Sequence, residues 1–344
     1  MSAQTLTGTR TPRGPGHPSR WLVWIASMRA WLFLVLLLIV FEVWSRVSYG
    51  ASFVLSSYNA QSIAVFAVAP LLLALGETFV IIAGGIDLSV GFIMGLSAVV
   101  AAHATNAAGG VMPPFPAMLV GILAGLAVAL IPGGVNGWLI SKLKVPPFIG
   151  TLGMFGVARG AAFLLAKGTT VPVSNSWFAA LGNSRVLGFP VVVIVASLFV
   201  LLMHYVLSQT RFGQHTYAVG ASEQAALRAG IGVGRHTRKL YLLSAFCAGL
   251  GGVLYAARFT AGAAQAGEPL LLDSIAAVVI GGASLFGGSG TILGTVAGAL
   301  VIAVIQYGLV FIDVEPFWQF VAVGVVIIIS VLVDQTQRRL GGDR

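Results

Sequence analysis

Long apolar runs recur along this 344-residue sequence, and most are close to the length that a helix needs to cross a bilayer. A transmembrane helix takes about 20 apolar residues, and lipid offers no partner to unpaired backbone groups. We therefore expect an all-α polytopic membrane protein. The runs predict about ten transmembrane helices, at 30–47, 60–82, 88–104, 116–138, 147–166, 189–207, 240–258, 271–286, 291–312 and 317–333.

The distribution of charge predicts how the chain is oriented. Only 8% of the residues are charged, whereas soluble domains have about 25%. If the N-terminus lies inside, 14 of the 19 Lys and Arg residues fall on inner segments, so the positive-inside rule predicts that both termini are cytoplasmic. The net charge of +9 is then explained by basic residues that set the orientation of the chain and bind anionic lipid headgroups, so it requires no nucleic-acid partner.

The ends of the chain differ from the rest in composition. Residues 1–20 are rich in Pro, Gly, Thr and Arg, and we predict a disordered basic cytoplasmic tail over 1–29. The first apolar run contains Glu42 and no cleavage site of small residues, which favours a span over a signal peptide. We expect a transmembrane domain over 30–335 and a cytoplasmic tail over 336–344. The connection after Phe286 is short, so the spans on either side of it are alternatively partly re-entrant.

A Gly-rich octet, Gly84-Gly85-Ile86-Asp87-Leu88-Ser89-Val90-Gly91, joins two of the apolar runs. Its carboxylate at the edge of hydrocarbon is costly and its glycines weaken a helix, so local stability does not explain it. Asp87 is predicted to be the N-cap of the following span, a charge that takes part in gating, or both, since an N-cap at an internal hinge can have both roles. A second Gly-rich turn, 281–291, shares the pattern Gly-Gly-x-(Asp/Ser)-Leu, a faint sign of an internal repeat.

The longest inner segment, about 208–239, contains signals for a short helix. Ser222 is a good N-cap, Glu223 puts a negative charge in the first turn, and Gly230 suits the residue that ends a helix. A helix of about two turns does not persist alone in water, so it docks either on the protein's own inner surface or in a groove of a cytoplasmic ATPase. The flanking Arg and Lys residues favour the second interpretation. The predicted coupling residues are Gly220, Ser222, Glu223, Ala225, Ala226, Arg228, Gly230 and Ile231.

Four segments form a recognisable set: Glu77 to Gly91, 145–153 with Ala158-Arg159-Gly160, 220–231, and Ile275 to Gly294. Together they resemble the permease subunits of ribose-type sugar ATP-binding cassette importers. The resemblance implies the ABC importer permease fold, a multi-pass location in the bacterial cytoplasmic (inner) membrane, and import of a ribose-like pentose or a hexose by alternating access. It also implies three partners: a cytoplasmic ATPase, a periplasmic or lipid-anchored sugar-binding protein, and a second permease copy in a homodimer or paralogous heterodimer.

Polar and Gly residues at depth are the candidates for translocation and gating. Gln306 is a further polar group at depth, while Arg159 is interpreted as snorkelling or bonded to outer-side carbonyls. The predicted translocation and gating residues are Gly84, Gly85, Asp87, Ser89, Gly91, Glu77, Asn136, Thr151, Gly281, Gly282 and Ser284.

No catalytic motif is present, so we predict that the chain is not an enzyme. It lacks the Gly-x4-Gly-Lys-(Ser/Thr) phosphate loop, which assigns ATP hydrolysis to a separate subunit. One cysteine, Cys247, and five histidines without i, i+4 spacing predict no metal site, and we expect no cofactor. Alternative substrates are a polyol, a furanosyl signalling compound or a branched-chain amino acid. An ion-coupled secondary transporter would need acidic pairs at mid-depth, for which Glu77 and Asp87 are too few and too near the inner side.

Overall fold

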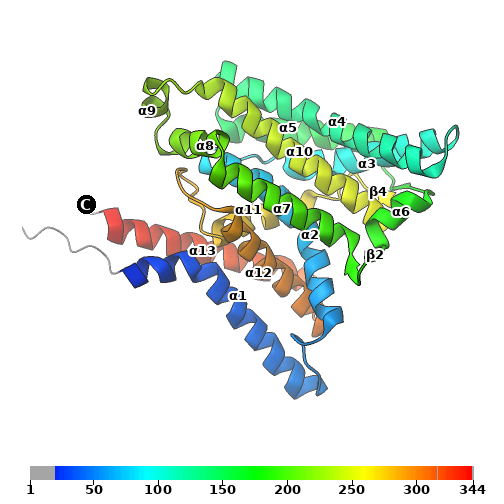
Figure 1. Ribbon diagram of the computed structural model, residues 1–344, viewed down its shortest axis with the longest axis horizontal. Coiled ribbons are helices and arrows are strands. Elements are labelled where there is room, and N and C mark those ends of the chain that lie inside the picture. The colour runs from blue at the N-terminus through cyan, green and yellow to red at the C-terminus, as the bar shows by residue number, and fades with distance from the viewer. Residues whose placement is uncertain (1–19, 316, 343–344) are drawn as a thin grey trace, which may run out of the picture.

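The computed structural model describes residues 20–315 and 317–342, which form a bundle of helices with two short strand pairs (Figure 1). The helices are α1 (Arg20–Tyr49), α2 (Ser57–Ile82), α3 (Val90–Gly109), α4 (Pro114–Lys142), α5 (Pro147–Ala166), α6 (Ser176–Asn183), α7 (Val191–Gln209), α8 (Arg211–Ala221), α9 (Glu223–Arg228), α10 (Val233–Phe259), α11 (Glu268–Ile280), α12 (Ile292–Phe311) and α13 (Phe317–Gly342). The strands are β1 (Val171–Pro172), β2 (Arg185–Val186), β3 (Phe189–Pro190) and β4 (Ala261–Gly262), paired antiparallel as β1–β4 and β2–β3.

Eight helices of the described chain are long and apolar enough to cross a membrane: α1, α2, α3, α4, α5, α7, α10 and α12. The predicted span at 271–286 is wrong in its extent, because α11 ends at Ile280. Its 13 residues rise about 20 Å, less than the roughly 30 Å of a hydrocarbon core. A helix of this length reaches only part of the way through a bilayer.

Both terminal helices overlap the predicted tails. Helix α1 begins at Arg20, so the part of the predicted tail that follows residue 19 is helical, and residues 1–19 lie outside the described residues. Helix α13 continues past the predicted last span as far as Gly342, which makes most of the predicted C-terminal tail helical. Arg, Leu, Ala and Met residues in 20–29 and Gln, Arg and Leu residues in 334–342 have good helix propensity, and this allows each terminal helix to extend beyond its predicted span.

The helices form an inner set and an outer set. Most side chains of α2, α3, α10 and α12 are buried, whereas most of those of α1, α4, α5 and α7 are partly or fully exposed. The inner helices approach closely through small residues: a Cβ on Gly252 of α10 would overlap the carbonyl oxygen of Met94 in α3. Close packing of backbones replaces the hydrophobic effect as the force between helices in lipid. The outer set therefore presents its apolar side chains to lipid or to another subunit.

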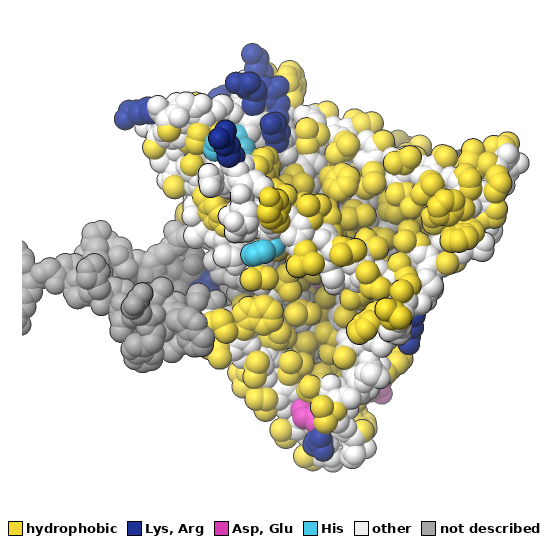
Figure 2. All heavy atoms as spheres, in the orientation of Figure 1, with side chains coloured by type: hydrophobic (Ala, Val, Ile, Leu, Met, Phe, Trp, Pro, Cys, Tyr) yellow, Lys and Arg dark blue, Asp and Glu magenta, His cyan; other side chains and the backbone are white. Residues whose placement is uncertain are grey.

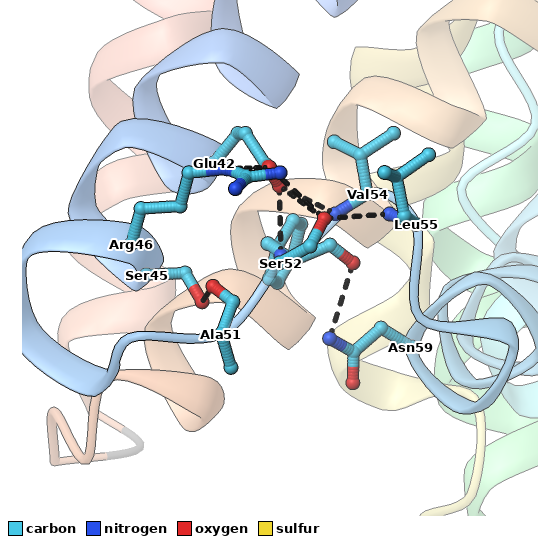
Figure 3. A network of polar contacts seen from close by, with 9 residues as sticks. Glu42, Ser45, Arg46, Ala51, Ser52, Val54, Leu55 and Asn59 are labelled. Carbon is cyan, nitrogen blue, oxygen red and sulfur yellow. Dashed lines mark hydrogen bonds and ion pairs between the residues drawn. The ribbon is translucent and has the colours of Figure 1, made fainter.

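The link between α1 and α2 is held by one carboxylate, that of Glu42 (Figure 3). Glu42 Oε2 accepts hydrogen bonds from the backbone N–H groups of Phe53 (2.7 Å) and Val54 (2.8 Å) and from Ser52 Oγ. Its Oε1 accepts from Arg46 Nε at 2.6 Å. The backbone groups of the turn are thus satisfied without a strand or helix, so the one acidic residue of α1 fixes where the chain turns back.

The predicted inner segments gather at one end of the bundle. In Figure 1, α8, α9, the start of α1 and the end of α13 all lie toward the left of the view. Figure 2 shows Lys and Arg side chains concentrated where α8 and α9 lie, and apolar side chains over the long flank. This separation fits the orientation expected from the positive-inside rule, with this end toward the cytoplasm.

Candidate functional site

The first Gly-rich turn begins as a helix terminus that requires glycine. Gly84 has a φ of +83°, its N–H donates to Ile81 O (2.9 Å), and the N–H of Gly85 donates to Val80 O (2.9 Å). This pair of bonds is the Schellman motif, in which the residue after the C-cap adopts the left-handed conformation. The motif ends α2 at Ile82 and turns the chain back toward the bundle.

The second Gly-rich turn uses the same motif. Gly282 has a φ of +93° and donates to Val279 O (3.0 Å), and Ala283 donates to Val278 O (3.1 Å). Gly282 therefore takes the place that Gly84 takes in the first turn, one residue later than the sequence pattern would align them. The common Gly-Gly pattern reflects two helices that end in the same way.

The two Gly-rich turns and the end of α8 meet through their backbones. The N–H of Gly288 donates to Ile82 O at 2.8 Å. A Cβ on Gly220 would overlap that same carbonyl oxygen, and a Cβ on Gly287 would lie 2.9 Å from Gly220 O and 3.1 Å from Gly84 N. No side chain separates these segments where they meet.

Asp87 lies at the centre of a buried polar network that joins four helices. Its Oδ1 accepts from the backbone N–H (3.1 Å) and the hydroxyl of Ser89, and its Oδ2 accepts from Ser244 Oγ of α10 at 3.0 Å. Asn136 Nδ2 of α4 donates to Ser89 Oγ (2.9 Å), and the backbone N–H of Asp87 donates to Glu77 Oε2 of α2 (3.4 Å). All five side chains are fully buried.

This geometry excludes the simpler role for Asp87. The N-cap interpretation is wrong, because α3 begins at Val90 and its N-cap residue is Ser89, whose side chain makes no capping bond. The Asp87 carboxylate is engaged by the turn and by α10 instead. Among the described residues, the ion pairs are Arg46–Glu42, Lys144–Glu223 and Arg159–Glu268, so neither Asp87 nor Glu77 has a basic partner there.

Several buried polar atoms around the network have no hydrogen-bond partner among the described residues. They include Glu77 Oε1, Asn136 Oδ1 and Tyr241 Oη. Two buried carboxyl groups without a cation are costly to maintain, and unpaired polar atoms add to that cost. Costly groups at membrane depth point to function. The network is therefore a candidate for the part of the protein that rearranges.

The remaining predicted gating residues lie around these turns. Thr151 Oγ1 donates to Ile86 O at 3.2 Å, and Ser284 Oγ accepts from the N–H of Phe286 (3.1 Å). Close backbone packing accounts for two glycines: a Cβ on Gly91 would lie 2.5 Å from Gly267 O, and a Cβ on Gly281 would overlap Gly294. The structure thus brings the predicted residues to two joined places, the Asp87 network and the junction of the Gly-rich turns.

The predicted short helix is confirmed as α9. Ser222 Oγ accepts from the N–H of Ala225 at 3.2 Å, and the N–H groups of Gly230 and Ile231 donate to Leu227 O and Ala226 O, both at 3.0 Å. Gly230 has a φ of +81°. The helix therefore has the predicted N-cap and a Schellman motif at its end.

One predicted coupling residue points the wrong way for contact with a partner. Ala226 is 3% exposed and packs with Val219 and Val233, so it docks α9 on the protein's own surface. The expectation that Ala226 belongs to the outward face is wrong, because a helix this short buries one side against its own bundle. Leu227 and Arg228 are exposed and supply the free side of α9.

A cavity of about 310 Å³ connects α9 with the first Gly-rich turn. Its walls include Gly84, Gly85 and Tyr241 on one side and Lys144 and Glu223 on the other. Lys144 Nζ and Glu223 Oε1 are 3.4 Å apart and well exposed, so this ion pair adds little stability. The pair instead marks where α9 meets the segment between α4 and α5.

The site contains residues that the sequence motifs did not mark. Ser244 and Tyr241 of α10 flank Asp87 and Gly85, and a Cβ on Gly85 would lie 2.7 Å from Tyr241 Oη. Neither belongs to a motif. Arg159, expected to snorkel, lies 4.0 Å from Glu268 and 5.3 Å from the centre of the Phe92 ring. Among the described residues, no three His, Cys, Asp or Glu side chains are placed to bind a metal ion together.

Comparison with known proteins identifies what this arrangement belongs to. Residues 59–331 match the family described as the branched-chain amino acid transport system permease component. The chain belongs to this permease family. The permease is 40% identical over 266 residues to the ribose import permease of Bacillus subtilis, covering 77% of this chain and 80% of the relative.

Two further relatives agree. The permease is 38% identical over 272 residues to the fructose import permease of Rhizobium meliloti, covering 77% of this chain and 74% of the relative. It is 34% identical over 345 residues to the ribose import permease of Escherichia coli, covering 98% of this chain and 100% of the relative. The resemblance seen in the motifs is confirmed, and the permease is a multi-pass protein of the bacterial cytoplasmic membrane. It is a transporter subunit and not an enzyme, since ATP hydrolysis belongs to a separate ATPase.

Proposed function

We propose that this permease is the membrane-spanning subunit of an ATP-driven importer for a monosaccharide, and that it works by alternating access. The observation that carries the proposal is the backbone junction between α8 and both Gly-rich turns. The substrate class comes from relatives whose names describe ribose, fructose and D-allose transport. A pentose or hexose is therefore the expected cargo.

The cycle follows from the order of contacts. An ATPase subunit binds the exposed side of α9, where Leu227 and Arg228 are free. Its closure moves α9 and then α8, because the two helices are joined at Ser222, the N-cap of α9. The end of α8 at Gly220 presses on Ile82 O, which is also hydrogen-bonded to the second turn. Both turns shift together, and the Asp87 network exchanges partners between two states.

Two further partners complete the importer. A sugar-binding protein delivers the cargo from outside, and a second permease copy, identical or paralogous, closes the pathway. The outer set of helices supplies surface for that copy, since a Cβ added to Gly153, Gly156 or Gly160 of α5 would meet no atom of the described chain within 4 Å. Small residues of this kind allow two transmembrane helices to approach closely.

Reconstitution tests the proposal. The permease would be assembled in proteoliposomes with the ATPase and the sugar-binding protein encoded beside it, and uptake of labelled ribose, fructose, allose and leucine would be measured. We expect uptake of a monosaccharide that requires ATP and the binding protein. Uptake of leucine instead would favour the branched-chain amino acid alternative. Uptake driven by an ion gradient without ATP would overturn the assignment to an ATP-driven importer.

A further inference from the structure

A second buried carboxylate, Asp273, lies away from the Asp87 network. It is in the middle of the short helix α11 and is 5% exposed. Its Oδ2 accepts from Gln306 Nε2 of α12 at 2.7 Å, while Oδ1 accepts no hydrogen bond from the described residues. No described Lys, Arg or His forms an ion pair with it. A buried carboxylate without a cation partner among apolar helices costs free energy, so its presence calls for an explanation.

Asp273 lies in the wall of two adjoining cavities. They measure about 620 and 420 Å³ and share Tyr255, Pro269, Asp273 and Phe320. Sites for small molecules usually measure about 300–1,000 Å³, so the space suits a small molecule. We call the two cavities together the α11 chamber. It is separate from the Asp87 network, because Tyr255 lies about three turns along α10 from Ser244.

The cations near the chamber are engaged elsewhere. Arg258 lines it, but its Nη1 donates to Asn183 Oδ1 at 2.6 Å. Arg159 lies within 4.0 Å of Glu268, another wall residue. Asp273 is therefore not neutralised by either arginine, and its free oxygen is available to a hydrogen-bond donor that enters the chamber.

Most of the other wall residues are apolar, and the few polar ones suit a neutral ligand that has both hydroxyl groups and an apolar C–H face. Gln265, Gln306 and Gln319 bring amide groups that both donate and accept hydrogen bonds. Tyr255 and Phe320 bring aromatic rings that pack against the C–H face of a ring-shaped molecule. A hydrophobic cargo would leave Asp273 and the amides unpaired, and a second carboxylate would be repelled.

We propose that the α11 chamber is a binding station for the hydroxyl groups of the transported sugar, with Asp273 and Gln306 as its central hydrogen-bonding pair. The inference rests on the proposed function, because it names the place where the cargo is held inside the permease. The sugar stays there briefly between release by the binding protein and the movement of the Gly-rich turns.

Transport by the reconstituted complex tests the chamber. In Asp273→Asn the carboxylate is lost and the shape is kept, and we expect the maximal uptake rate to fall about ten-fold or more. Co-purification with the ATPase stays at the wild-type level. Glu315→Gln is the matched control, since Glu315 is exposed in the loop before α13 and does not line the chamber, and its uptake stays normal.

A binding measurement keeps the inference testable even if Asp273→Asn folds poorly. In a Cys247→Ala background, Leu272→Cys, an exposed wall position outside the central pair, would be alkylated with and without the transported sugar at millimolar concentration. Slower alkylation with sugar supports the chamber. Wild-type uptake by Asp273→Asn, or alkylation that sugar leaves unchanged, would overturn it, as would protection by Na⁺ alone. If the wild-type complex transports no monosaccharide, the proposed function itself fails, and that result is separate from these.

Discussion

Gly220 of α8 touches the carbonyl oxygen of Ile82 at the end of α2, with no side chain between them. The same oxygen accepts the N–H of Gly288 at 2.8 Å. One carbonyl group is thus the meeting point of the predicted coupling region and of both Gly-rich turns. The end of α8 therefore contacts the end of α2 through backbone atoms alone, at the same carbonyl group that the second Gly-rich turn contacts.

The substitution Gly220→Ala tests this junction. The added methyl group would overlap Ile82 O, and overpacking of this kind costs about 1–3 kcal/mol. We expect uptake to be lost while the ATPase still binds, because the far side of α9 is unchanged. Gly234→Ala is the control, since its Cβ would lie 3.7 Å from Ser141 O, an ordinary contact. Equal uptake by the two variants would show that the junction transmits nothing.

The substitution Asp87→Asn removes the negative charge of the side chain and keeps its shape. The hydroxyls of Ser89 and Ser244 can rotate to pair with an amide, so we expect the fold and the assembly to survive. Uptake should fall about ten-fold or more if the charge stabilises one of the two states. Asp313→Asn is the control, because Asp313 lies in a loop at a φ of +58°, which asparagine tolerates. Full uptake by Asp87→Asn in proteoliposomes would remove the gating role of the carboxylate.

Two neighbouring positions on α9 should give different defects when each is replaced by aspartate. Leu227→Asp places a charge on the exposed side, so we expect weaker co-purification with the ATPase and an unchanged melting temperature of the permease alone. Ala226→Asp places a charge against Val219 and Val233, so the permease itself should melt earlier. If Leu227→Asp binds the ATPase as the wild type does, α9 is not the docking helix.

The orientation of the chain is open to a labelling experiment. In a Cys247→Ala background, Ser222→Cys should resist a membrane-impermeant thiol reagent applied to intact cells, because α9 is expected to face the cytoplasm. Leu187→Cys should react, since Leu187 is 93% exposed in the turn between β2 and β3 at the opposite end of α7. Reaction at position 222 alone would reverse the topology.

Local signals in the sequence were enough to predict α9. Its N-cap at Ser222 and its terminal glycine at Gly230 act within a few residues, and both have the predicted hydrogen bonds. Those signals could not predict the burial of Ala226, because the six residues of α9 are too few to show which side of the helix is apolar. Capping chemistry is local, whereas the direction that a short helix faces is set by tertiary contacts.

Partners that are far apart along the chain could not be predicted. Ser244 bonds to Asp87 across a separation of 157 residues, and no pattern around Ser244 marks it. Gln306 was singled out as a polar group at depth, but its partner Asp273 was not. The apolar run at 271–286 is long enough to be predicted as a full span, so the sequence did not show that α11 has only 13 residues. The place of Asp273 in a helix this short was therefore not predicted either.

The segment before α11, residues 261–268, packs against Gly91 and Gly95 of α3, and we call this part of the α3 surface the slot. The contact has a consequence for biosynthesis. Gly91 and Gly267 lie backbone to backbone, and a Cβ on Gly95 would overlap the carbonyl of Ala264. The ribosome makes α3 long before it makes residues 261–268, so the slot stays open to lipid while most of the chain is inserted. The final core of this permease therefore closes late, and a ribosome that stalls before α11 leaves a product that is inserted yet incomplete.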